Sequence, residues 1–442
     1  MVEVILVLLG ISLILFFGFF AEFIFKKFSI PDVLFLIILG FVLGPHALGW
    51  VDLSQISALI PIFTTFTLLF LLFDGAFNIN LSSLVKEFSQ SLILTIFNFI
   101  ISTIIVTVIM MVSGFPFLVS LFTGFLLGGV SSSFVIPILK EINVSTKLYS
   151  LLTLESALTD VFCIVFSLTI IKIINLGTFA IRPLATELVS LFAIAGLVGV
   201  LAGVIWIVLI LKVFKKHSYI MVVAFLILVY VVTEFLKGNG AIATLFFGLM
   251  LNNSKQLSSI FKGISSEKQN VGKKALSGEL GVSVTTPSEQ EFYHQISFLL
   301  KTFFFVYIGL LIDFSDTKAL IVGGIISVAL MLARLASRTL TKEMLSENRS
   351  LVDSMFARGL AAAVIAQLAV EANVPHADFI VRVAFVAITG TILLSSIRIF
   401  ILKAQGHFKG EPTGVQVSDG KKVPTEVIQK NKPKVNKRKR KS

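Results

Sequence analysis

The sequence predicts an all-α membrane protein that crosses a lipid bilayer about thirteen times. Of the 442 residues, 56% are hydrophobic and only 14% are charged, whereas a soluble protein carries roughly 25% charged residues. Apolar runs of about 18 residues or more recur along nearly the whole chain, and each can cross a hydrocarbon core of about 30 Å. We therefore expect a polytopic helical protein whose first run is a retained span and not a signal peptide.

The expected spans, in chain order, cover residues 2–24, 30–48, 56–76, 89–113, 116–139, 149–175, 184–214, 218–236, 238–252, 291–313, 318–340, 350–371 and 376–402. Only Lys237 and Gly238 separate the eighth span from the ninth, so a merged eighth span is an alternative. Lysine and arginine gather in the connections after odd-numbered spans and in the tail. By the positive-inside rule, the N-terminus lies outside a cell membrane and the C-terminus in the cytoplasm.

Two polar segments divide the chain. Residues 254–290 are rich in Ser, Lys and Glu, and we expect a flexible cytoplasmic loop within a transmembrane domain of residues 1–403. Residues 404–442 form a basic tail that we expect to be disordered, solvated or drawn to anionic lipid headgroups. The net charge of +12 does not indicate nucleic-acid binding, because no folded module accompanies the basic block. With a single cysteine, Cys163, the chain has no intramolecular disulfide.

Five ionisable residues lie well inside the expected spans: Glu155, Asp160, Lys301, Arg334 and Arg358. Each such residue costs roughly 2.5–3.5 kcal/mol to insert, so it needs a partner or a function. At a rise of ~1.5 Å per residue, Glu155 and the two arginines lie ~9–12 Å from the cytoplasmic end of their spans. Asp160 and Lys301 lie deeper, at ~15–18 Å. This predicts one layer in which Glu155 pairs with Arg334 or Arg358, and a second in which Lys301 pairs with Asp160 or extends toward the cytoplasm.

Helical geometry separates the two carboxylates of the sixth span. Glu155 and Asp160 lie ~140° apart around the helix, whereas Ser156 shares a face with Asp160. Asp160, with oxygens from Ser156 and Thr159, is therefore the better site for a monovalent cation. Glu155 is better explained as half of a structural ion pair.

Two stretches predict interrupted helices. LLGGVSSSFVIP in the fifth span sets two glycines beside Ser131, Ser132 and Ser133, and MFARGLAAAVIA in the twelfth has Arg358-Gly359. Unwound carbonyls and serine hydroxyls there can complete a cation's shell. The alternative is close helix packing through small residues. LLFLLFDGAFNIN in the third span also echoes FFFVYIGLLIDF in the tenth, as an inverted repeat would.

These stretches resemble the monovalent cation:proton antiporter superfamily, in particular NhaP-type sodium/proton antiporters. IPDVLFLIILGFVLGP, LLFLLFDGAF, GNGAIATLFFGLMLNN and KTFFFVYIGLLID are similar to its patterns in the second, third, ninth and tenth spans. ESALTD stands where the family has ESxxND, and ARGLAAAVIA where it has a mid-span Arg-Gly. The resemblance covers roughly residues 30–400. It implies an NhaA-like inverted-repeat fold, a homodimer in the bilayer, a moving core domain and a role in pH homeostasis.

When the family's residue roles are transferred to the matching positions, the resemblance implies that Asp160 binds the cation or the proton beside Ser156. It also implies that Glu155 pairs with an arginine. The chain departs from the family at two places. Thr159 replaces the asparagine of the Asn-Asp pair, and Ser131, Ser132 and Ser133 replace a Thr-Asp-Pro, as in Kef-type potassium/proton systems. The site therefore lacks one carboxylate.

The sequence-based hypothesis is an electroneutral exchange of Na⁺ or Li⁺ for H⁺, with Asp160 as the shared site and Lys301 as a modulator. An empty charged carboxylate is disfavoured in a desolvated site, so the proton and the cation compete for it. The alternatives are a K⁺/H⁺ antiporter on the same fold, and a channel or a sodium-coupled symporter. No enzyme motif and no cofactor site is present in the spans.

Overall fold

The computed structural model describes residues 2–405, apart from 29–30, 46, 52–58, 78–80, 143, 177–180, 211–218, 255–286 and 343. All regular structure in this part of the chain is helical. The expected cytoplasmic loop, for the most part, and the basic tail lie outside the described residues.

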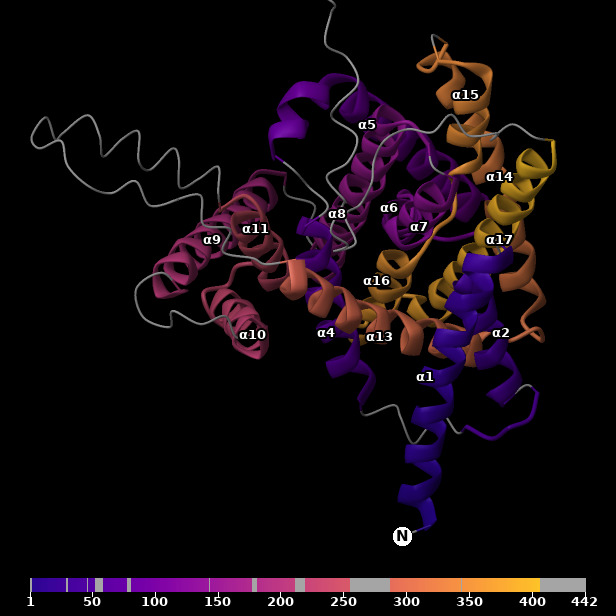
Figure 1. Cartoon of the computed structure of the whole chain (residues 1–442), viewed down its shortest axis with the longest axis horizontal. Helices are drawn as coiled ribbons and strands as arrows, with labels where there is room; N and C mark the ends of the chain where they lie inside the picture. Colours follow the sequence, from indigo (N-terminus) through magenta and orange to yellow (C-terminus); the bar gives the residue numbers. More distant parts are fainter. Residues whose placement is uncertain are drawn as a thin grey trace, which may run out of the picture. The chain divides into compact units, whose positions relative to one another are not determined.

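The helices, in chain order, are α1 (Val2–Phe28), α2 (Asp32–Leu43), α4 (Ile60–Phe77), α5 (Leu81–Val112), α6 (Phe117–Leu126), α7 (Ser132–Ile142), α8 (Thr146–Leu176), α9 (Ile181–Leu209), α10 (Tyr219–Phe235), α11 (Gly240–Asn252), α13 (Pro287–Leu311), α14 (Thr317–Arg334), the 3₁₀-helix η3 (Leu335–Thr339), α15 (Ser346–Ser354), α16 (Leu360–Glu371) and α17 (Ala377–Ala404) (Figure 1). Each expected span coincides with one helix or with an interrupted pair. Seven of the described helices are long and apolar enough to cross a membrane, and the other apolar helices are shorter.

The eighth and ninth spans are separate helices, so the merged alternative is wrong. Between α10 and α11 the chain turns at Lys237, whose φ of 58° is left-handed. Asn239 then caps α11, because its side-chain oxygen accepts a hydrogen bond from the Ile242 amide at 3.0 Å.

The fifth and twelfth spans are discontinuous, as predicted. Helix α6 ends at Leu126 and α7 begins at Ser132, while α15 ends at Ser354 and α16 begins at Leu360. The residues in between are extended or turned, which leaves four helix ends inside the bundle. Helix ends carry unpaired backbone groups and partial charges, so these breaks are where polar chemistry concentrates.

The helices pack in two groups. One, here called the site group, contains α5 to α8 and α14 to α17; the other, the support group, contains α1, α2, α4, α9 to α11 and α13. Figure 1 shows α9, α10 and α11 side by side within the support group. The main contact between the groups is made by α16 against α4.

Helices α4 and α13, which belong to the third and tenth spans, run antiparallel. The Phe63 ring stacks on Phe304 at 5.9 Å, while Asp74, further along α4, pairs with His294, which comes earlier in α13. Opposite directions are what an inverted repeat requires of this pair.

Helices α2 and α13 approach so closely that only glycine fits between them. A Cβ atom on Gly309 would collide with the backbone carbonyl of Ile37, and one on Gly40 would collide with the carbonyl of Val306. Small residues allow membrane helices to pack backbone against backbone.

We predict that Gly309→Ala destabilises the protein by about 1–3 kcal/mol, because backbone cannot move aside for the new methyl group. The control is Gly324→Ala, since a Cβ atom at Gly324 in α14 meets nothing within 4 Å. Thermal unfolding of the detergent-solubilised variants checks this. An unfolding temperature for Gly309→Ala equal to that of Gly324→Ala would contradict it.

Candidate cation site

Asp160 meets the start of α7 where the fifth span resumes its helix. The Ser132 hydroxyl donates a hydrogen bond to Asp160 Oδ2 at 2.5 Å, and the Ser132 backbone amide faces the same carboxylate. Ser132 is the first residue of α7, so its amide has no partner within the helix. The carboxylate therefore lies at the partly positive end of a helix, with a hydroxyl and an amide to orient it.

The two interrupted spans cross next to Asp160. The Ser131 amide donates to the Ala357 carbonyl at 2.9 Å, which joins the extended segment of the fifth span to that of the twelfth. Gly359 lies directly against the Ser131 side chain, where a Cβ atom would not fit. Ser133, the second residue of α7, is half-buried.

Arg358 neutralises the end of α6. Its fully buried guanidinium donates to the carbonyls of Gly128, at 3.0 Å, and Gly129, and to the Ser102 hydroxyl at 3.0 Å. Its own backbone amide donates to Thr391 Oγ1. A cation at the C-terminal end of a helix offsets the unpaired carbonyls. Arg358 is therefore not the partner of Glu155.

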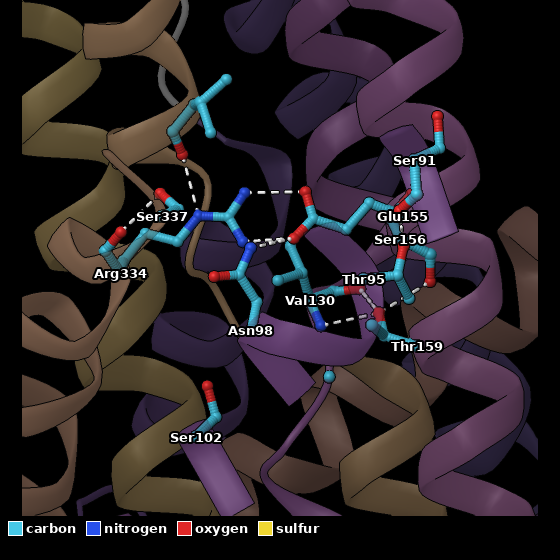
Figure 2. A network of polar contacts seen from close by, with 12 residues as sticks. Ser91, Thr95, Asn98, Ser102, Val130, Glu155, Ser156, Thr159, Arg334 and Ser337 are labelled. Carbon is cyan, nitrogen blue, oxygen red and sulfur yellow. Dashed lines mark hydrogen bonds and ion pairs between the residues drawn. The ribbon is translucent and has the colours of Figure 1, made fainter. Parts of the chain in front are cut away.

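Glu155 pairs with Arg334 instead (Figure 2). The guanidinium donates to both carboxylate oxygens, through Nη1 to Oε1 and through Nη2 to Oε2 at 2.8 Å. Asn98 Nδ2 also donates to Oε1 at 2.8 Å, and Arg334 Nε donates to the Val352 carbonyl at 2.9 Å. Both charged side chains are almost fully buried, so this bidentate, hydrogen-bonded pair ties α8, α14 and α5 together.

Two residues expected to be cation ligands bond to backbone in this structure. Thr159 Oγ1 accepts a hydrogen bond from the Val130 amide at 3.0 Å and lies 3.1 Å from the Ser156 carbonyl, to which it donates (Figure 2). Ser156 Oγ donates to the Thr153 carbonyl. Thr159 therefore holds the unwound segment before α7 in place, while Ser132 is the hydroxyl that contacts Asp160.

The expected partner for Lys301 was wrong. Lys301 Nζ lies 2.6 Å from Asp32 Oδ2, and the two side chains are largely buried between α13 and α2 in the support group. Lys301 is therefore not the partner of Asp160. Depth along a span places a residue in a layer, but it does not say which neighbouring helix the residue faces.

Three residues that bond to the buried charges were not identified from the sequence: Asp32, Asn98 and Ser102. Asp32 begins α2, at the edge of an apolar run, so its position in the sequence does not indicate an intramembrane charge. Asn98 and Ser102 continue a stripe with Ser91 and Thr95 on one face of α5 (Figure 2). Polar residues spaced four, three and four apart in an apolar span are a signal that could have found them.

The chain matches the family described as "Sodium/hydrogen exchanger, transmembrane" over residues 11–404. It belongs to the sodium/hydrogen exchanger family. A curated relative, the "Probable Na(+)/H(+) antiporter 3" of Methanocaldococcus jannaschii, is 28% identical over 184 residues. That alignment covers 40% of this chain and 47% of the relative, so it spans about half of the relative's length.

The fold is that of a solved exchanger. The sodium proton antiporter MjNhaP1 of Methanocaldococcus jannaschii, in its structure at pH 8, matches with a TM-score of 0.69 at 20% sequence identity, over 92% of this chain and 100% of that chain. A second structure of the same antiporter, from electron microscopy, matches with a TM-score of 0.65, also at 20% identity, over 92% and 99% of the two chains. At this identity the likeness establishes the shared fold.

We predict that Glu155→Ala costs roughly 3–5 kcal/mol of stability, because it leaves the Arg334 guanidinium buried without a counter-charge. The double variant Glu155→Leu with Arg334→Met should recover most of that loss, since neither charge is then buried alone. Unfolding temperatures of the two variants measure the difference. A double variant no more stable than Glu155→Ala would show that Arg334 is not the residue that depends on Glu155.

Proposed function

We propose that this exchanger is an electroneutral antiporter of Na⁺ or Li⁺ against H⁺, working by alternating access with Asp160 as the shared binding site. The family, the fold and the position of Asp160 at the crossing of two interrupted spans support this proposal. The membrane is a cell membrane, the C-terminus is cytoplasmic and the working unit is a homodimer.

One observation carries the proposal. Among the described residues, Asp160 is the carboxylate at the crossing with no basic side chain within ion-pair distance, whereas Glu155 is neutralised by Arg334. Arg358 is occupied by the α6 carbonyls, and Lys301 by Asp32. A lone carboxylate withdrawn from water costs free energy until a proton or a cation neutralises it.

The competition between proton and cation couples the two fluxes. One carboxylate accepts one positive charge at a time, so one monovalent cation moves for each proton and no net charge crosses the membrane. The Ser132 amide holds the carboxylate in place, while the Ser132 hydroxyl can turn its oxygen toward a bound cation. The site group then shifts against the support group, and either ligand changes that balance only through its different affinity for the two states.

A K⁺/H⁺ antiporter is the second candidate. It is favoured by the serines at 131–133, which supply hydroxyl and carbonyl oxygens where NhaP-type antiporters carry a second carboxylate. Fewer charged ligands reduce the advantage of a small, strongly hydrated ion over a larger one. The two candidates are separated by comparing the exchange rates that Na⁺, Li⁺ and K⁺ produce in proteoliposomes.

We predict that Asp160→Asn abolishes cation-driven dissipation of a pH gradient in proteoliposomes, because an amide neither releases a proton nor neutralises a cation. Wild type should respond to Na⁺ and Li⁺ at a rate unaffected by a valinomycin clamp of the membrane voltage. The measurement is fluorescence of a pH dye with Na⁺, Li⁺ and K⁺ added in turn.

The matched control is Asp378→Asn, at an exposed aspartate near the start of α17, which should exchange like wild type. A response to K⁺ alone would establish the second candidate. Proton movement retained in Asp160→Asn, or none in wild type with any cation, would refute the proposed site or the exchange itself.

We predict that Ser132→Ala raises the apparent KM for the cation about tenfold, the effect of losing one charge-assisted hydrogen bond. Ser133→Ala, the adjacent half-buried serine, should leave KM within about twofold of wild type. Initial exchange rates over a cation series give both values. Equal effects of the two substitutions would remove Ser132 from the site.

A further inference from the structure

We propose that a cavity between α5, the start of α8 and the connection from η3 to α15 binds the headgroup of an anionic phospholipid. The cavity has a volume of about 440 Å³. It belongs to the site group but lies apart from Asp160, and the exchange chemistry proposed above makes no use of it.

The polar part of the cavity suits an anion. Its lining includes Ser145, Thr341 and Asn348 together with Lys147, which is the charged residue of that lining. Among the described residues, no carboxylate pairs with the exposed Lys147 ammonium. A cation and neutral hydrogen-bonding groups favour a phosphate over a cationic or an uncharged group.

The apolar part leads toward lipid. Ile93, which lines the cavity, is 55% exposed and begins a stripe along α5 that continues through the exposed Ile96, Ile100 and Ile104. These positions are three or four residues apart, so they share one face of the helix. On the opposite rim, Leu345 is 73% exposed. An occupant with a phosphate in the cavity and acyl chains on this stripe would satisfy both parts, which a free phosphate ion would not.

The position in the membrane agrees with this occupant. All three segments that line the cavity lie at the ends of spans that the sequence places on the cytoplasmic side, where anionic lipids attract basic residues. Leu94 and Leu151 form part of the cavity wall and stand one helical turn before Asn98 and Glu155. The cavity therefore reaches to just below the buried Glu155–Arg334 layer.

The test is native mass spectrometry of the full detergent-solubilised chain, titrated with phosphatidylglycerol and, in parallel, with phosphatidylcholine. Wild type should bind phosphatidylglycerol in preference to phosphatidylcholine. Lys147→Ala should weaken the tightest phosphatidylglycerol adduct roughly fivefold, the loss expected for about 1 kcal/mol from one basic residue. Asn348→Trp, which fills the cavity from its partly exposed rim, should weaken the same adduct at least as much.

The matched control is Lys342→Ala, an exposed lysine of the same connection that does not line the cavity, and it should bind like wild type. Equal weakening in Lys342→Ala would assign the binding to general surface charge and overturn the proposal. Equal affinity for phosphatidylcholine, or displacement of the lipid by millimolar inorganic phosphate, would also overturn it. Unfolding temperatures near that of wild type confirm that each variant is folded, and either of the two cavity variants suffices for the test.

Discussion

The structure depends on how it satisfies unwound backbone inside an apolar bundle. Carbonyls and amides freed by a helix break cannot bond to water within a membrane, so protein groups must pair with them. At the fifth span this pairing comes from Arg358, whose guanidinium holds the carbonyls of Gly128 and Gly129, and from Thr159, which holds the Val130 amide. The costly breaks are thereby stable, and the free amide of Ser132 is left to face Asp160.

The distribution of charge follows from these pairings. Two buried arginines of the site group are held near the crossing. Arg358 bonds to backbone carbonyls and Arg334 to Glu155, and each site has a further hydrogen bond with α5. Such pairs have little reason to take up an ion, since each charge already faces protein groups of opposite charge or polarity. Asp160 differs because its described partners are neutral. The exchange proposed for this protein thus follows from which carboxylate was left without a cation.

The sequence predicted the helices and their interruptions well, because apolar length and Gly/Ser runs are local properties of the chain. It also predicted that Glu155 pairs with an arginine and that Asp160 lies on a different face. It could not choose between Arg334 and Arg358 as the partner of Glu155, and it did not identify Asp32 as the partner of Lys301. A partner depends on how helices rotate and pack against each other. The sequence also could not predict that Thr159 binds the Val130 amide, since a hydroxyl oxygen can accept a hydrogen bond from backbone or coordinate an ion.

Close backbone packing and ion pairs hold each helix group together, whereas the contact between the two groups is mainly apolar. The support group has glycine-mediated contact of α2 with α13 and the Asp32–Lys301 pair, while the site group has the crossing and the Glu155–Arg334 layer. Every polar contact described above lies within one group or the other. Between the groups, the main contact is that of α16, with its run of buried alanines, against α4. Apolar contact is non-directional, so one group can slide along the other without breaking a set of specific hydrogen bonds, which is what the proposed alternating access at Asp160 needs.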